Sequence, residues 1–353
     1  MDTTYSIAVV PGDGIGQEVV PAAVHVLDVA AERFGFAFDW RAYQWGCDHY
    51  VRTGRMMPTD GLERLREHDA IFLGAVGRPD VPDHVSLWGL LIPIRRAFRQ
   101  YVNLRPARLL PGVTSPLARP ADIDLMVVRE NNEGEYSEIG GRLYRGLPEE
   151  MAVQEAVFTR CGTERVMRYA FDLARSRKGR LTSATKSNGI IHTMPFWDEV
   201  CEDVARDYPD VSVRRVLIDA LAAGLVRDPG DFDVIVASNL FGDIVSDLTA
   251  ALSGSLGLAP SANLNPEGDT PSMFEPVHGS APDIAGRGVA NPLAQIWTGA
   301  MMLDHLGQPQ AARLVTDALE DVLASAEVHT PDLGGEATTE RVVDAVTDRL
   351  RRA

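Results

Sequence analysis

The sequence has few of the features that mark secreted, membrane-spanning or cysteine-rich proteins. Its three cysteines, Cys47, Cys161 and Cys201, are widely spaced and form no Cys-x-x-Cys pair, so no disulfide framework is expected. No run of about 18 apolar residues occurs, which argues against a membrane span. The first residues, MDTTYSIAVV, lack the basic region and apolar stretch of a signal peptide. The cytoplasm is therefore the expected compartment.

Positive charge is also scarce. Lysine and arginine total 34 against 50 aspartates and glutamates, which gives a formal net charge of −16. Nucleic-acid binding needs a basic face, so this balance argues against such a partner. A small anionic substrate would need a local group of cations instead. One candidate group comprises five arginines within fourteen residues: Arg95, Arg96, Arg99, Arg105 and Arg108.

The length of 353 residues exceeds what one hydrophobic core usually organises, so two domains or one large α/β unit are expected. Short apolar strands alternate with helical patterns, which predicts an α/β fold with a largely parallel sheet. Ligands of such sheets gather at the carboxyl ends of strands, where the Gly-rich segments PGDGIG and GAVGRPD fall. The first segment departs from the dinucleotide pattern G-x-G-x-x-G, so alone it indicates only a tight turn.

The segment VIVASNLFGDIVSD carries two carboxylates in a helical pattern. Residues 234–237 predict a buried strand, and Ser238 and Asn239 are typical helix-capping residues. On the helix that follows, Asp243 and Asp247 stand four residues apart and share one face. A solvated surface is the commoner explanation of such a pair. The alternative is a hard divalent cation, because Mg²⁺ and Mn²⁺ prefer oxygen ligands.

Other charged residues also fall at predicted strand ends. Arg129 ends the strand 124–128, Lys186 follows the strand RLTSA, and Asp219 follows the strand 211–218. Taken alone, Lys186 is better explained as a surface lysine, although desolvation near cations would lower its pKa and make it a general base. Independent surface charges would not recur so regularly at strand ends. Their coincidence favours the metal site.

The last third of the chain contains a long stretch without regular periodicity. It begins after Leu258 and is predicted to be a functional loop that holds a flat or phosphorylated ligand. Asp283 would accept hydrogen bonds from ribose hydroxyls and repel a 2′-phosphate, which favours NAD over NADP. Helices are predicted at residues 163–176, with Thr163 as the cap, and at 292–306, 310–326 and 338–351.

Together these motifs resemble the β-decarboxylating dehydrogenases of the isocitrate/isopropylmalate dehydrogenase family. The resemblance covers nearly the whole chain and rests on PGDGIG, NLRP, VREN, TKSN, NLFGDIVSD and FEPVHGSAPDIAGRGVANP. PDHVSLWG, QYVNLRPARL and TSATKSNG are most similar to the tartrate and D-malate dehydrogenase branch. The resemblance implies an isopropylmalate dehydrogenase-like α/β fold, in which two domains share a central mixed sheet and the active site lies in the cleft. Residues 1–102 plus 255–353 would bind the cofactor, and 103–254 would bind substrate and metal and dimerise through an arm at about 137–160.

The resemblance also implies roles for individual residues. Lys186 would deprotonate the substrate hydroxyl, and Tyr136 would protonate the enolate left by decarboxylation. The substrate carboxylates would bind Arg95, Arg105 and Arg129. The metal ligands would be Asp243, Asp247 and, from the second subunit of a homodimer with shared active sites, Asp219. Lys186 would likewise come from the partner subunit. The adenosine site would comprise His278, Gly279, Ser280, Ala281, Asp283, Ile284 and Asn291.

The activity implied is NAD-dependent oxidative decarboxylation of a 2-hydroxy diacid, namely D-malate to pyruvate and carbon dioxide, together with turnover of tartrate. The cofactors would be NAD and Mn²⁺ or Mg²⁺, with a monovalent cation such as K⁺ as a further candidate. Pro93 is unusual inside a helix and is expected to shift Arg95.

Three alternatives stay open. A 3-isopropylmalate dehydrogenase is disfavoured by Trp88, where those enzymes carry a small segment with an acidic residue, although Leu91 and Ile92 would shelter an alkyl group. A catalytically silent regulatory subunit is disfavoured because the whole chemical set is present. A dehydrogenase that needs no metal rests on GDGIG alone.

Overall fold

The computed structural model describes residues 3–119 and 122–352, and it confirms the α/β class. The outermost predicted boundaries, at residues 1 and 353, lie outside the described residues. The chain forms two compact units. The terminal unit comprises residues 3–100, 108–119 and 250–352 of the described chain, and the central unit comprises 101–107 and 122–249.

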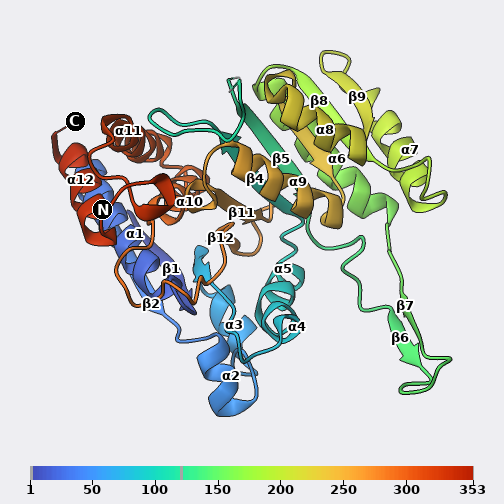
Figure 1. The fold of residues 1–353 in the computed structure, drawn as a ribbon, viewed down its shortest axis with the longest axis horizontal. Coiled ribbons are helices and arrows are strands. Elements are labelled where there is room, and N and C mark those ends of the chain that lie inside the picture. The colour runs from blue at the N-terminus through green and yellow to red at the C-terminus, as the bar shows by residue number, and fades with distance from the viewer. Residues whose placement is uncertain (1–2, 120–121, 353) are drawn as a thin grey trace. The chain divides into compact units, whose positions relative to one another are not determined.

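The sheet of the terminal unit contains both parallel and antiparallel strands. Its strands lie in the order β2-β1-β3-β12-β11, and β1, β2, β11 and β12 are labelled in Figure 1. β1 pairs in parallel with β2 and β3, and β12 pairs in parallel with β3. β11 is antiparallel to β12. The strand bounds are β1 Thr3–Gly12, β2 Phe36–Ala42, β3 Ala70–Ala75, β11 Pro260–Leu264 and β12 Ser272–Pro276.

The β11–β12 hairpin corrects one prediction, because this segment was expected to be loop. Both strands are buried along their whole length. Strands buried on both faces lack the alternation of apolar and polar residues that identifies a strand in sequence. β11 also contains polar residues such as Ser261 and Asn263, which are fully buried here. Because polar residues are not expected in a buried strand, they made this strand harder to predict.

Helices cover the strands of the terminal unit. The long helices α1, α10, α11 and α12 pack on one another, and α10 is buried along most of its length. The bounds are α1 Gly16–Phe34, α2 Cys47–Thr53, α3 Gly61–Arg66, α4 Asp83–Ser86, η1 Leu87–Leu91, α5 Ile92–Ala97, η3 Leu256–Leu258, α10 Leu293–His305, α11 Pro309–Ser325, η4 Pro331–Leu333 and α12 Thr339–Arg352. No helix in the described ranges is long and apolar enough to cross a membrane.

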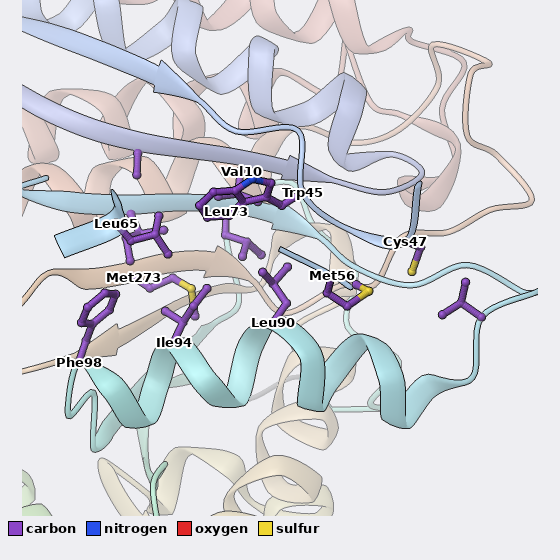
Figure 2. Packing of buried hydrophobic residues seen from close by; sticks show 13 residues of the cluster. Val10, Trp45, Cys47, Met56, Leu65, Leu73, Leu90, Ile94, Phe98 and Met273 are labelled. Atoms are coloured by element: carbon purple, nitrogen blue, oxygen red, sulfur yellow. The ribbon is translucent and has the colours of Figure 1, made fainter. Parts of the chain in front are cut away.

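One continuous helical segment, α4–η1–α5, carries Arg95. Its residues Leu90, Ile94 and Phe98 point at the sheet and pack in a buried cluster with Leu73 and Met273 (Figure 2). The segment contains a π-helical turn, in which the Ile92 N–H bonds to the Leu87 carbonyl. This wider turn lies just before Pro93, whose ring would clash with a carbonyl of a regular α-helix. Packing thus fixes the helix from which Arg95 projects.

The central unit contains a second group of strands, in the order β4-β5-β10-β8-β9. β5, β10, β8 and β9 form parallel neighbours, so their carboxyl ends meet at one edge. The strand bounds are β4 Val102–Arg108, β5 Asp124–Glu130, β8 Arg180–Thr185, β9 Ser212–Leu217 and β10 Val234–Ala237. The helices are α6 Arg160–Ser176, α7 Thr193–Ala205, α8 Ile218–Arg227, η2 Pro229–Asp231 and α9 Asn239–Leu252.

The start of α6 corrects a second prediction. The N-cap is Thr159, whose side chain accepts the Gly162 N–H, and not Thr163. Thr163 is buried inside the helix. The sequence obscured this first turn because glycine is a poor helix former.

A hairpin projects from the rest of the central unit (Figure 1). Its strands, β6 Gly140–Leu143 and β7 Met151–Gln154, are antiparallel and exposed at every residue. Large apolar side chains are exposed along it: Ile139, Leu143, Tyr144, Leu147, Met151 and Val153.

Candidate active site

Five residues of the central unit lie together at one face of α9. We call them the carboxylate cluster. They are Arg105, Arg129, Tyr136, Asp243 and Asp247. Asp243 accepts hydrogen bonds from Arg129 and, at 2.7 Å, from the Tyr136 hydroxyl. Arg105 Nη1 donates to Ser246 Oγ at 2.7 Å and lies 3.4 Å from a carboxylate oxygen of both Asp243 and Asp247. The structure therefore brings together two predicted metal ligands, two predicted substrate-binding arginines and the predicted acid.

The strand register explains how Arg129 reaches α9. Ala237, the last residue of β10, pairs with Arg129 near the end of β5, and α9 begins two residues later. Gly242 lets the helix approach, because a Cβ there would lie 2.6 Å from the Arg129 Cβ. Asn239 Oδ1 accepts from Arg129 Nε at 3.1 Å and from Nη2 at 2.7 Å. Arg129 is buried to 2% exposure and is held on two sides.

Charge and burial set the protonation of the cluster. Burial raises the pKa of Tyr136, and the hydrogen bond to Asp243 raises it further. The phenol therefore keeps its proton at neutral pH and has one to give. Burial also raises the pKa of Asp247, against the opposing effect of Arg105. Two arginines balance the two carboxylates of the cluster.

The donor set suits a hard divalent cation, but one chain does not complete it. Asp243 and Asp247 offer carboxylate oxygens from adjacent turns, which is the ligand chemistry that Mg²⁺ and Mn²⁺ prefer. Within residues 3–119 and 122–352, no three carboxylate, histidine or cysteine side chains gather as a metal site. Asp219 therefore does not join the other two aspartates inside a single chain.

Asp219 lies instead beside Lys186, and we call these two residues the exposed pair. Lys186 Nζ donates to Asp219 Oδ1 at 2.7 Å, and this hydrogen bond lowers the pKa of Asp219. The side chains are 30% and 65% exposed, respectively. Lys186 follows β8 as predicted. Asp219 was expected just after a strand 211–218, but β9 ends at Leu217 and Asp219 lies in the first turn of α8.

Arg95 belongs to the terminal unit and has a carboxylate partner there. Its Nη2 donates to Glu275 Oε1 at 2.6 Å, and the side chains of both residues are nearly buried. Asn263 Nδ2 donates to the same oxygen at 2.8 Å. Sequence reasoning missed Glu275 and Asn263, because both lie in the segment that was predicted to be a loop.

The predicted adenosine residues lie on a loop between β12 and α10. A Cβ on Gly14 would be 2.0 Å from the Ser280 carbonyl oxygen, which accepts the Ile15 N–H at 2.9 Å, so the PGDGIG turn touches this loop directly. Ala281 has a φ of +40°, an uncommon conformation for a residue with a side chain. Gly279, Asp283 and Ile284 are at least partly accessible, whereas Ser280 and Asn291 are buried.

His278 offers an observation that fits a nucleotide. Its Nδ1 lies 3.0 Å from the Gly279 carbonyl, while its Nε2 is buried without a hydrogen-bond partner in the described residues. Burial lowers the pKa of this histidine. Buried polar atoms are nearly always paired, so Nε2 and the accessible backbone around it leave hydrogen-bonding capacity for a polar ligand such as NAD.

Three glutamates lie in residues 130–136, which we call the glutamate turn. Of these, sequence reasoning singled out Glu130 as a charged strand end but missed Glu133 and Glu135. Glu130 accepts the backbone N–H groups of Asn132 and Glu133 at 2.7–3.1 Å and folds the turn back. Glu135 accepts the Leu240 N–H at 3.1 Å and the Ser238 hydroxyl at 2.8 Å, at the start of α9. Ser238 and Asn239, the expected capping residues, thus bind Glu135 and Arg129 instead.

Glu133 plays a similar part at a different helix. Its carboxylate accepts the N–H of Thr159 at 2.8 Å and the hydroxyl of Thr159 at 2.6 Å, at the start of α6. Gly162 leaves room for it, because a Cβ there would lie 2.3 Å from Glu133 Oε2. The only sequence signal was the density of carboxylates in RENNEGEY, which has many explanations.

Comparisons with known proteins agree on one family. The model of the family described as isocitrate/isopropylmalate dehydrogenase matches residues 6–346. A probable tartrate dehydrogenase/decarboxylase of Bacillus subtilis is 56% identical over 350 residues, covering 99% of this chain and 98% of that protein. D-malate dehydrogenase [decarboxylating] of Escherichia coli is 56% identical and covers 100% of both. The crystal structure of isocitrate dehydrogenase from Methylococcus capsulatus superposes with a TM-score of 0.89 at 37% identity, covering 98% of this chain and 99% of that one.

Proposed function

This chain belongs to the isocitrate/isopropylmalate dehydrogenase family, and from that premise we propose that it catalyses NAD-dependent oxidative decarboxylation of a 2-hydroxy diacid. We propose D-malate and tartrate as its substrates. The names of the relatives above support this choice. The observation that carries the proposal is the carboxylate cluster. It brings together arginines that can bind a diacid, carboxylate oxygens that can bind a metal, and a protonated phenol.

In this proposal Arg95, Arg105 and Arg129 bind the carboxylates of the substrate, since a guanidinium offers paired donors to a carboxylate. Asp243 and Asp247 hold Mn²⁺ or Mg²⁺ together with Asp219 of a second copy. When bound, the ion would supply Lewis-acid chemistry and NAD would supply a hydride acceptor.

Two residues of the chain move protons. Lys186 Nζ takes the hydroxyl proton as the hydride leaves C2. The Tyr136 hydroxyl, kept protonated by its burial and by Asp243, gives its proton to the carbon that has lost carbon dioxide. Lys186 and Asp219 contact each other in one chain, and we propose that they complete the carboxylate cluster of a second copy. The exposed apolar hairpin β6–β7 is a suitable contact between the two copies.

The surroundings of Arg95 favour a small diacid over 3-isopropylmalate. Ile92 is buried, and Leu91 packs against the hydrophobic cluster of Figure 2. The Arg96 guanidinium lies 5.1 Å from the ring centroid of Trp88, so this ring is also engaged. Leu91 and Ile92 are therefore engaged in packing rather than available to shelter an alkyl group, whereas Trp88 also lines a mostly apolar cavity with Met56, Met57 and Pro58.

A substrate panel tests the proposal. The values of kcat/KM for D-malate, tartrate and 3-isopropylmalate are measured from NADH formation with Mn²⁺ or Mg²⁺, with and without K⁺, and after chelation. We expect D-malate and tartrate to be preferred and activity to disappear with the metal. Preference for 3-isopropylmalate would overturn the substrate assignment, and undiminished activity after chelation would overturn the metal. Absence of NADH formation with every acid would favour a regulatory subunit.

A further inference from the structure

Glu18 connects the first turn of α1 to the loop that contains the predicted adenosine residues. Its Oε1 accepts the Gly286 N–H at 2.6 Å, and its Oε2 accepts the Gly288 N–H at 2.8 Å. Both oxygens of one carboxylate are therefore used on backbone groups of a single loop. These bonds join residues 268 and 270 positions apart in sequence, within the terminal unit.

The two glycines have the backbone conformation that makes this contact. Gly286 has a φ of +77° and Gly288 a φ of +64°, which glycine adopts without a steric penalty. No atom lies within 4 Å of a Cβ built at either position, so the conformation rather than lack of room calls for glycine. Turns of this kind direct backbone N–H groups at an anion. Here the anion is supplied by the chain itself.

The same loop has a second attachment to α1. Ile15 and Val19 form a small buried cluster with Ala290, against which Ala281, Ile284 and Ala285 pack. This apolar contact and the Ser280 carbonyl hold the part of the loop nearest β12. Residues 286–288 have no such packing at the glycine positions, so their position depends on hydrogen bonds. Besides Glu18, the bond from the Thr339 N–H to the Gly288 carbonyl, at 2.9 Å, is one of these.

We propose that Glu18 is a positioning residue for the adenosine half of the nucleotide. It holds residues 286–288 so that the loop from His278 to Asn291 keeps the shape that receives the ligand. The proposal rests on the function proposed above, which assigns NAD to this loop. Glu18 acts through the loop backbone rather than by taking part in hydride or proton transfer.

Substitution of Glu18 separates this role from catalysis. Glu18→Ala removes both acceptors, and Glu18→Gln keeps one acceptor while turning an amide donor towards a glycine N–H. Hydrogen bonds to a carboxylate are stronger than those to a neutral group, so we expect the KM for NAD and the Kd for NADH to rise roughly tenfold in either variant. The kcat at saturating NAD should stay within about twofold, because a positioning effect on binding leaves the chemical step unchanged.

A second readout needs no cofactor. Hydrogen exchange of the Gly286 and Gly288 amides, measured in the ligand-free full-length protein, should become faster in both Glu18 variants. Asp69→Asn is the matched control. Asp69 also accepts a backbone N–H in the terminal unit, that of Ser6 at 2.8 Å, but does not contact the loop. This control should leave the exchange of the two glycine amides and the KM for NAD unchanged.

The outcomes distinguish this proposal from the proposed function. Unchanged exchange in both Glu18 variants would overturn it, as would faster exchange with an unchanged Kd for NADH. A kcat loss with an unchanged KM for NAD would also overturn it. If the unsubstituted protein binds no NADH, the cofactor assignment fails and the nucleotide role fails with it, while exchange still shows whether Glu18 holds the loop.

Discussion

The carboxylate cluster and the exposed pair differ in how deeply they are buried and in how many hydrogen bonds a single chain makes to them. Arg129 is 2% exposed and binds both Asp243 and Asn239, and Tyr136 and Arg105 also contact Asp243. Lys186 and Asp219 have the same types of charge but bind each other at a largely accessible position.

The difference indicates which part of the site is organised before anything binds. In the glutamate turn, Glu130 accepts the Glu133 N–H, and Glu135 accepts the Leu240 N–H at the start of α9. These two contacts preorganise the geometry of the cluster within one chain. The exposed pair is free to be completed from outside. In the proposed mechanism both regions are needed for chemistry, but we expect the buried cluster to contribute more to the stability of the chain than the exposed pair.

Neutralising one carboxylate in each half tests this contrast most strongly. Asp243→Asn and Asp219→Asn should each lower kcat/KM by roughly 10³-fold or more, because each removes a proposed metal ligand. Their effects on folding should differ. Asp243→Asn removes a carboxylate partner from the buried Arg129 and should lower the free energy of unfolding by about 1–2 kcal/mol, whereas Asp219→Asn should change it much less, because the Asp219 side chain is largely exposed.

Kinetics and urea denaturation of the two variants provide the measurements. Metal-dependent turnover retained by both variants would contradict the metal assignment. Equal losses in the free energy of unfolding would contradict the contrast between the carboxylate cluster and the exposed pair.

The pH dependence of stability should also separate the two regions. Burial raises the pKa of Glu130 to about 7, against the backbone N–H groups of Glu133 and Asn132. A raised carboxyl pKa means that the folded state binds the proton more tightly. The stabilisation is thus present below the usual glutamate pKa and is lost as pH rises through about 7.

Comparison with Glu130→Gln isolates this effect. From pH 4.5 to 8 the free energy of unfolding of the unsubstituted protein should fall relative to that of the variant, by roughly 3 kcal/mol. Asp219→Asn should show no such difference over this range, because the pKa of Asp219 is lowered. Parallel pH profiles for Glu130→Gln and the unsubstituted protein would rule out the titration of Glu130.

A smaller effect tests whether the glutamate turn preorganises α9. Glu135→Gln weakens the contact at the start of the helix that carries Asp243, and Glu133→Gln weakens the corresponding contact at α6, which carries no proposed site residue. Both variants should lose about 1 kcal/mol of stability. Only Glu135→Gln should lower metal affinity or kcat, by about tenfold, as substitutions next to metal ligands do. Equal kinetic effects in both variants would remove the special role of Glu135.

The sequence predicted three residues of the cluster because they follow a simple rule. Asp243, Asp247 and Arg129 lie at the carboxyl ends of strands that read as short apolar runs, and parallel strands bring such ends to one edge. Lys186 follows the same rule, but its role as a base and the roles of Arg105 and Tyr136 came from resemblance to the family. The family resemblance is confirmed by the comparisons.

The parts that could not be predicted depend on contacts between distant segments. Glu135 binds the start of α9, and Glu18 binds a loop at the other end of the chain. A carboxylate in a sequence does not reveal which backbone N–H it accepts. The β11–β12 hairpin was missed because burial on both faces removes the alternation by which a strand is recognised.

Mixing two inactive variants tests the central claim, that the two halves complete each other across two copies. Tyr136→Phe damages the carboxylate cluster, and Lys186→Ala damages the exposed pair. In a mixed homodimer with shared sites, one site receives both substitutions and the other receives neither. Co-expression should therefore restore about a quarter of the unsubstituted activity, although each variant alone is nearly inactive. Activity no greater than that of the separate variants, in a preparation shown by mass spectrometry to contain mixed dimers, would contradict the shared site.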